Sequence, residues 1–240
     1  MEKEIVYVAD LDQDIDDVVA AHYLFNEGLL KCVVCDPYPK TQEGFKRKEK
    51  LERLGVQVSK KMPPAAKYVF VGGALTVVAD YIRMHHIEWL VMNGGFVGTN
   101  IAKSELEKFK GKETVRTYNF NCDVTAADHV LKADAKHISN IVLVGKNVCH
   151  DKRNTRMGIW SAQKYQDLFN EYHVKEQKLQ HDLLACHEGI AFLYQTEKLC
   201  DYEMVRPYNK GLQGNMTLWG STKSISSPYR EVWAAVGFCE

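Results

Sequence analysis

Short apolar runs that alternate with longer amphipathic segments constrain the fold of this chain more than any other feature of its sequence. Each run has the length and β-branched content of a strand, and its apolar residues are continuous, which is typical of parallel strands buried on both faces. Their alternation with helical segments predicts an α/β fold with an open, mainly parallel sheet and right-handed crossovers. The expected strands are Ile5–Ala9, Cys32–Cys35, Tyr68–Val71, Trp89–Met92 and Ile141–Val144, and the expected helices are Asp16–Phe25, Phe45–Leu54, Leu75–Met84 and Val124–Leu131.

The sequence changes in character after Trp160. A helical stretch runs to about Tyr194, and three strand candidates follow, divided by Gly and Ser clusters: Tyr202–Arg206, Met216–Trp219 and Glu231–Val236. Short strands separated by turn residues predict a small C-terminal antiparallel extension. Because 240 residues suit one large domain, we expect a single domain over residues 1–240.

Charge and cysteine content limit the partners and the compartment. Lys plus Arg and Asp plus Glu each number 31, so the chain lacks the basic excess typical of a nucleic-acid binder. Neither a signal peptide nor a spanning apolar segment is recognisable, so we expect no membrane association. Seven cysteines, an odd number, favour reduced thiols in the cytoplasm over a disulfide framework. The C-x-x-C of Cys32 and Cys35 lies within an expected strand, which favours buried thiols over a redox pair.

An acidic cluster follows the first expected strand. Five carboxylates fall within eight residues: Asp10, Asp12, Asp14, Asp16 and Asp17. Capping of the next helix explains one or two of them, since a helix N-terminus favours negative charge. The remainder repel one another unless a cation lies among them, and carboxylate oxygens suit a hard ion such as Ca²⁺ or Mg²⁺. The cluster therefore predicts a metal site at the end of this strand.

The spacing D-x-D-x-x-x-D-D after an N-terminal strand resembles the calcium-dependent nucleoside hydrolases of the inosine-uridine type. Four later segments resemble motifs of the same family in the same order, so the resemblance extends from about Val6 to Ala185. These segments are Val71-Gly72-Gly73-Ala74-Leu75-Thr76, Val91-Met92-Asn93-Gly94-Gly95-Phe96, Tyr118-Asn119 with Asp123 and Ala126-Ala127, and His181-Asp182-Leu183-Leu184-Ala185.

The resemblance implies a set of residues that hold Ca²⁺. Asp12 would be both a metal ligand and the general base, and Asp17 would be a bidentate ligand. Asp182 would supply a third carboxylate and Val71 a backbone carbonyl. Asp10 would be a neighbouring ligand, or would orient the others by hydrogen bonding.

The resemblance also implies how a substrate is held. Asp16 and Asn119 would hydrogen-bond the ribose, and Asp182 would contact it as well. His181 would be the general acid that protonates the departing base, since histidine can carry a proton near neutral pH. His150 has no comparable partner spacing, and we expect it to be a surface or packing residue.

The chain departs from the family pattern in three places. Gln13-Asp14 replaces a Pro-Gly inside the acidic motif, and Thr117 replaces a Glu that would contact the ribose 5′-hydroxyl. The segment between Asp17 and Val71 is short, and the missing part usually includes a loop over the active site. The metal ligands are unaffected, but Thr117 leaves room for a ribosyl substrate with an altered 5′ end.

The expected function is therefore Ca²⁺-dependent hydrolysis of the N-glycosidic bond of a ribonucleoside or a related ribosyl compound. Two alternatives remain open at this point. One is a metal-binding relative with weakened catalysis and a binding role; the other is a phosphatase of the haloacid-dehalogenase type, with Asp10 as nucleophile and Mg²⁺ as helper.

The resemblance favours a homo-oligomer, on which the sequence itself is silent. The basic run Lys46-Arg47-Lys48-Glu49-Lys50 is expected to be a solvated helix face.

Overall fold

A central sheet of eight strands organises the computed structural model, which describes residues 4–99, 106–112, 115, 117–150, 163–174, 180–200, 202–205, 216–217, 224–225 and 231–236. The strand order is β3-β2-β1-β4-β5-β6-β10-β7, and every neighbouring pair is parallel except β10 with β7. The strands of this sheet are β1 (Ile5–Ala9), β2 (Leu30–Cys35), β3 (Val58–Ser59), β4 (Tyr68–Val71), β5 (Ile87–Met92), β6 (Ile138–Leu143), β7 (Glu203–Val205) and β10 (Glu231–Val236).

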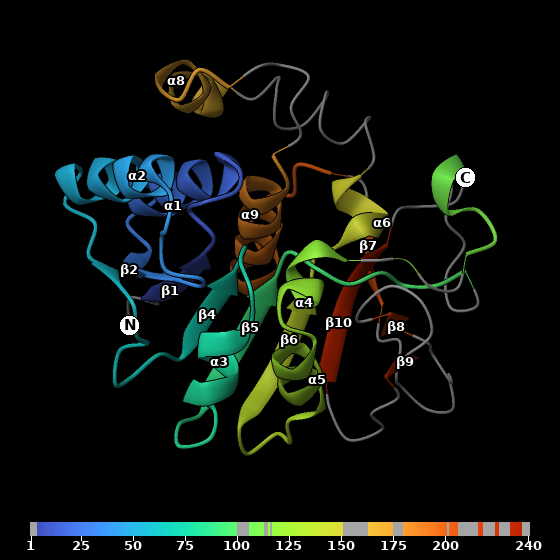
Figure 1. Ribbon diagram of the computed structural model, residues 1–240. Helices are drawn as coiled ribbons and strands as arrows, with labels where there is room; N and C mark the ends of the chain where they lie inside the picture. The colour runs from blue at the N-terminus through green and yellow to red at the C-terminus, as the bar shows by residue number, and fades with distance from the viewer. Residues whose placement is uncertain are drawn as a thin grey trace.

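Helices cover both faces of the sheet (Figure 1). One face packs on α1 (Asp16–Asn26), α2 (Gln42–Arg53), α6 (Lys146–Cys149), α8 (Gln163–Glu171) and α9 (His181–Tyr194). The other face packs on α3 (Thr76–Tyr81), α4 (Tyr118–Cys122) and α5 (Val124–Lys132). A 3₁₀ turn, η1 (Glu107–Phe109), lies between β5 and α4 in the chain. The continuous apolar strands follow from this double cover, since side chains on both faces are buried.

The predicted α/β class with a mainly parallel sheet is confirmed, and the C-terminal strands refine it. β10 was expected in an antiparallel extension, but it joins the main sheet parallel to β6. Among the described strands of the main sheet, β7 at the edge is the one that runs antiparallel to its neighbour. A separate antiparallel pair is formed by β8 (Met216–Thr217) and β9 (Ser224–Ile225). Residues 206 and 218–219 of the expected strands lie outside the described residues.

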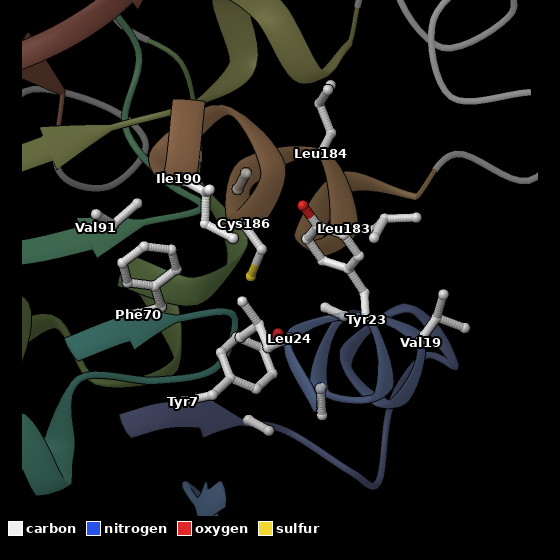
Figure 2. Packing of buried hydrophobic residues seen from close by; sticks show 14 of the residues in the cluster. Tyr7, Val19, Tyr23, Leu24, Phe70, Val91, Leu183, Leu184, Cys186 and Ile190 are labelled. Carbon is white, nitrogen blue, oxygen red and sulfur yellow. The ribbon is translucent and has the colours of Figure 1, made fainter. Parts of the chain in front are cut away.

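Close packing of α9 on the sheet positions the first turn of that helix. Gly189 lies so near the strands that a Cβ added there would come within 2.5 Å of the Cγ1 atom of Val91. Figure 2 shows Cys186 and Ile190 of α9 among the side chains of Tyr7, Phe70 and Val91. The absence of a side chain at Gly189 therefore lets α9 rest directly on the sheet.

The two cysteines of the C-x-x-C motif lie on opposite faces of β2. Cys32 is buried in one core cluster and Cys35 in the other. Burial raises the pKa of the Cys35 thiol to about 12 and also raises that of Cys32. This arrangement matches the expectation of buried thiols. Across the described helices, none has both the length and the apolar content needed to cross a membrane.

Candidate functional site

A pocket opens at the carboxyl ends of the central strands, where the chain changes direction across the sheet. From β1 the chain continues to β2 and β3 on one side, whereas from β4 it continues to β5 and β6 on the other. Ligands of open α/β sheets bind at such a switch point. The cavity measures about 120 Å³, and since one water needs roughly 10–15 Å³ by this measure, it can hold a small polar molecule. Its lining residues are Asp10, Gln13, Asp14, Asp16, Asp17, Gly72, Asn93, Gly94, Thr117, Tyr118, Asn119, Lys146, His150, His181 and Asp182.

Three buried carboxylates meet at the base of this pocket. Asp16 and Asp17 occupy the first turn of α1, and Asp182 occupies the first turn of α9. One oxygen from each lies within 4.8 Å of the others. The pKa of Asp17 is raised well above its ordinary value, mainly by burial and next by the charge of Asp16. The pKa of Asp182 is also raised well above its ordinary value, mainly by burial and next by the charge of Asp17. Three like charges this close are costly without a cation between them.

The surroundings of the carboxylates leave room for a cation. The hydroxyl of Tyr7 donates to Asp17 over 3.0 Å, and Nδ2 of Asn93 donates to Asp182 over 2.6 Å. Gly72 faces the same space, since a Cβ added there would come within 2.6 Å of Asp17 Oδ1 and 2.7 Å of Asp182 Oδ1. An all-oxygen donor set that is buried and held by hydrogen bonds fits a hard divalent ion such as Ca²⁺ or Mg²⁺.

Asp10 and Val71 lie beside this group at the ends of their strands. Asp10 is almost fully buried, lines the pocket and accepts a hydrogen bond from the backbone N–H of Asp12 over 3.1 Å. Burial raises the pKa of the Asp10 carboxyl. The carbonyl of Val71 accepts from the N–H of Asn93 over 2.9 Å, and a carbonyl oxygen has two lone pairs.

Asp12 is not one of the three carboxylates that meet at the base of the pocket, and its role as a metal ligand stays a prediction. Its carboxylate accepts from the N–H of Lys40 over 2.9 Å, and from the N–H and the hydroxyl of Thr41 over 3.1 and 2.7 Å. Partial burial acts to raise the pKa of Asp12, but the hydrogen bonds from Thr41 and Lys40 hold it below its ordinary value. The physical reason is the short connection after β2, which brings the start of α2 against the acidic loop.

The basic run on α2 is not wholly solvated, which corrects the expectation for it. Nη1 of Arg47 donates to the carbonyls of Leu11, Gln13 and Asp14 over 2.9 to 3.2 Å. The side chain of Arg47 is only 14% exposed, whereas that of Lys46 is 63% exposed. Arg47 therefore secures the backbone of the acidic loop.

The segment that includes α4 brings polar groups to the opposite side of the pocket. Nδ2 of Asn119 donates to the carbonyl of Asn93 over 2.9 Å, and both Asn119 and buried Thr117 line the pocket. Asp123 has a structural role, since its carboxylate accepts from the N–H of Ala126 and caps α5.

His181 and His150 form the remaining wall. Their ring centroids lie 4.6 Å apart, and the ring of His150 also packs against that of Phe109, in line with the expectation of a packing residue. His150 lines the pocket as well, which the sequence did not indicate. Burial, followed by the charge of Lys146, lowers the pKa of His181 to about 4. Nε2 of His181 is buried without a hydrogen-bond partner among the described residues. At neutral pH the His181 ring is therefore an uncharged group that faces the pocket.

The sequence did not single out several of the residues that build this site. Tyr7 and Lys146 were given no role, Asn93 stood in a motif without a role of its own, and His150 was expected to be a surface or packing residue. Asn93 and Lys146 each follow a central strand, so their positions at strand ends were a signal available in the sequence. Tyr7 offered no such signal, because a tyrosine within an apolar strand is usually a core residue.

Comparison with known proteins adds little to this geometry. No protein-family model matches the chain. An uncharacterized protein of Aquifex aeolicus (strain VF5) is 26% identical to it over 206 residues, a match that spans 82% of this chain and 64% of the Aquifex protein. The chain thus covers less than two thirds of the length of this relative.

Proposed function

We propose that this protein is a cytoplasmic, Ca²⁺-dependent hydrolase of the N-glycosidic bond of a ribonucleoside or a related ribosyl compound. The observation that carries the proposal is the buried group of Asp16, Asp17 and Asp182, with Asn119 and His181 in the wall of the same pocket. The carboxylates suit a cation that also binds sugar hydroxyls, and the amide and imidazole suit a polar ligand. The order along the chain of the motifs that resemble those of nucleoside hydrolases supports the same function.

Asp17, Asp182 and the Val71 carbonyl would hold the cation, with Asp16 at its edge. When bound, such an ion lowers the pKa of a coordinated water and orients substrate oxygens. Asp16 and Asn119 would hydrogen-bond the ribose hydroxyls, which makes the pocket selective against sugars that lack them. Hydrolysis also requires a proton acceptor on one face of the sugar and a contact to the leaving base on the other.

Two carboxylates compete for the role of proton acceptor. The resemblance assigns it to Asp12, whose oxygens are occupied by Lys40 and Thr41. The geometry favours Asp10, which lines the pocket and whose pKa is raised by burial. His181, uncharged at neutral pH, would contact the leaving base by a hydrogen bond from its buried Nε2 atom.

The decisive experiment measures reducing-sugar release from purine, pyrimidine and 5′-modified nucleosides, with Ca²⁺ or with chelator. We expect release only with Ca²⁺, and its loss in Asp17→Asn. Asp10→Asn and Asp12→Asn, run side by side, identify the proton acceptor as the variant whose kcat falls by about 10²-fold or more while Ca²⁺ binding persists. Asp80→Asn, an exposed carboxylate on α3, is the matched control.

Other outcomes would redirect the assignment. Release of inorganic phosphate from a simple phosphomonoester, without sugar release, would show a phosphatase and overturn the proposal. Ca²⁺ and ribose binding without turnover of any compound would indicate a binding protein that retains the metal site. Turnover of 2′-deoxynucleosides equal to that of ribonucleosides would contradict the roles given to Asp16 and Asn119.

A further inference from the structure

One lysine lies in the wall of the pocket that contains the carboxylates. Lys146 lines this cavity and is half-buried. Among the described residues that line the cavity, it is the one whose ordinary pKa, about 10.4, gives a positive charge at pH 7. His150 and His181, with an ordinary pKa of about 6.5, would be mostly uncharged at that pH. Because lysines are seldom buried, this position indicates that Lys146 contacts the ligand of the pocket.

The backbone that carries Lys146 is held closely against the segment after β5. The N–H of Lys146 donates to the carbonyl of Gly95 over 3.1 Å. A Cβ at Gly145 would collide with the same carbonyl oxygen, so the two segments can approach this closely only because position 145 has no side chain. Buried Asn147 accepts from the N–H of Val97 over 2.8 Å and donates to its carbonyl over 3.0 Å. Lys146 therefore projects from a well-defined backbone, as a residue that acts on a bound ligand requires.

The strand order places Lys146 across the pocket from the carboxylate that the geometry favours as proton acceptor. Asp10 follows β1 and Lys146 follows β6, and β4 and β5 lie between these two strands. Neighbouring strands lie roughly 4.8 Å apart, so the ends of β1 and β6 are separated by roughly 14 Å. Both side chains line the cavity between these ends. This arrangement leaves room for a sugar between an acceptor and a donor of protons, which glycosidic hydrolysis requires on opposite sides of the bond.

The surroundings of the Lys146 ammonium make it a stronger acid than an exposed lysine. Burial, followed by the charge of Lys108 on η1, lowers the pKa of Lys146, although Cys149 acts in the opposite direction. Nζ lies 3.1 Å from Nε2 of His150, and since an ammonium has three N–H groups, this contact occupies at most one of them. On α9, His181 lies close enough for the charge of Lys146 to lower its pKa. A lysine whose pKa is closer to neutral transfers its proton more readily.

We propose that Lys146 donates the proton to the departing base in the hydrolysis proposed above. The inference rests on that proposed function and assigns one step of it. As the bond between C1′ and the base breaks, its electron pair stays with the base, and a proton moves from Nζ to a nitrogen or oxygen atom of the base. Water adds to C1′ and gives a proton to the carboxylate across the pocket; solvent then returns a proton to Nζ and takes one from the carboxylate. His181 contacts the base without supplying the proton, the role that the resemblance implies for it.

Substrates that differ in their need for a proton test this role, with Ca²⁺ present throughout. A purine or pyrimidine base leaves poorly as an anion, whereas 4-nitrophenolate leaves readily without a proton. In Lys146→Gln, kcat should fall by about 10²-fold or more with inosine, adenosine and uridine, and the loss with 4-nitrophenyl riboside should be at least about tenfold smaller. Lys146→Arg keeps the positive charge but holds its proton tightly, so it should lose as much as Lys146→Gln. Lys132→Gln, an exposed lysine on α5, is the control and should behave like the wild type.

Other results would overturn the assignment. Equal losses with the nucleosides and with 4-nitrophenyl riboside would show that Lys146 only supports the structure of the pocket. Full activity of Lys146→Arg would show that the charge matters and the proton does not. Unchanged turnover of nucleosides by Lys146→Gln would remove the donor and leave the hydrolase in place. Absence of sugar release from every compound by the wild type would reject the hydrolase, and the donor with it.

A measurement on the wild type replaces the variants if Lys146→Gln does not fold, as judged by circular dichroism. Deprotonation of Lys146 at alkaline pH should lower kcat with inosine, adenosine and uridine, but not with 4-nitrophenyl riboside. A parallel fall with both kinds of substrate would overturn the proposal.

Discussion

Nδ2 of Asn93 donates a 2.6 Å hydrogen bond to Oδ1 of Asp182, which connects the end of β5 to the first turn of α9. The Asn93 carbonyl in turn accepts from Asn119, so one residue links the carboxylate group to the proposed ribose side of the pocket. This relationship explains why a residue that carries no charge is central to the site. It orients Asp182 without adding a fourth negative charge.

Replacement of Asn93 by Ala should weaken Ca²⁺ binding by about 10–100-fold, the usual effect of losing a hydrogen bond that orients a metal ligand. Calorimetric Ca²⁺ titration measures the change. Asn140→Ala is the matched control, because Asn140 is a part-buried asparagine whose amide donates to the carbonyl of Glu88 instead. Equal losses in the two variants would show that the effect is general destabilisation and not a loss of orientation at Asp182.

Removal of one buried carboxylate should separate metal binding from stability. In wild type, Ca²⁺ at 100 times its Kd should add about 2.7 kcal/mol to the free energy of unfolding, or roughly 5–10 °C in Tm. Asp17→Asn should lose this response, yet in chelator it should be at least as stable as wild type, because it lacks the repulsion that raises the pKa of its neighbours. Differential scanning calorimetry with and without Ca²⁺ checks both expectations. A wild-type Tm that is indifferent to chelator would count against a Ca²⁺ site.

A methyl group at position 72 should close the metal site. In Gly72→Ala the new Cβ would approach the Tyr7 hydroxyl, Asp17 and Asp182, so we expect at least a tenfold loss of Ca²⁺ affinity, with destabilisation of about 1–3 kcal/mol. Gly189→Ala provides the contrast, since its Cβ would meet Val91 in the core and not the carboxylates. Denaturant unfolding and Ca²⁺ titration together distinguish the two variants. Retained Ca²⁺ affinity in Gly72→Ala would falsify the proposed position of the ion.

The sequence predicted well those parts of the site that depend on strand order. Asp10 and Asp16 follow β1 at the edge of the sheet where the carboxyl ends of the parallel strands meet, and Asn119 reaches the same pocket from α4. Asp182 joins them from α9, which begins at the same edge. Sequence motifs can predict that such residues lie close together, because each motif lies at the end of a strand or the start of a helix.

Side-chain direction within the acidic loop could not be predicted in the same way. Asp12 turns toward Thr41, and Arg47 secures the loop carbonyls, through contacts between residues about thirty positions apart in the chain. The geometry of these contacts depends on how α2 packs against the acidic loop after a short connection. No local sequence pattern predicts that packing. The convergence of Lys108 and Lys146 on His150 depends equally on tertiary packing. These contacts involve single atoms, whereas periodicity reports only which face of an element is buried.

A buried histidine that does not line the pocket should make the fold sensitive to acid. His22 on α1 is 6% exposed, and its Nδ1 lies 3.1 Å from the hydroxyl of Tyr172. Burial lowers the pKa of His22, although the charge of Glu171 opposes the shift. Below the unfolded pKa of about 6.5, the unfolded chain therefore binds a proton that the folded chain resists. The free energy of unfolding should fall as pH decreases below 6.5, and the loss from this group is complete once pH passes its lowered folded pKa.

Replacement of His22 by Gln should reduce the dependence of stability on pH in that window. Urea unfolding at several pH values between 7.5 and 5, with chelator present throughout, measures the slope for wild type and variant. His86→Gln is the control, because His86 is exposed and its hydrogen bond to Ser139 lies at the surface. An identical slope in wild type and His22→Gln would assign the acid sensitivity to other groups. A shallower slope in His22→Gln, with His86→Gln unchanged, would show that the α1–α8 contact acts as the acid-sensitive element, since His22 on α1 faces Glu171 at the end of α8.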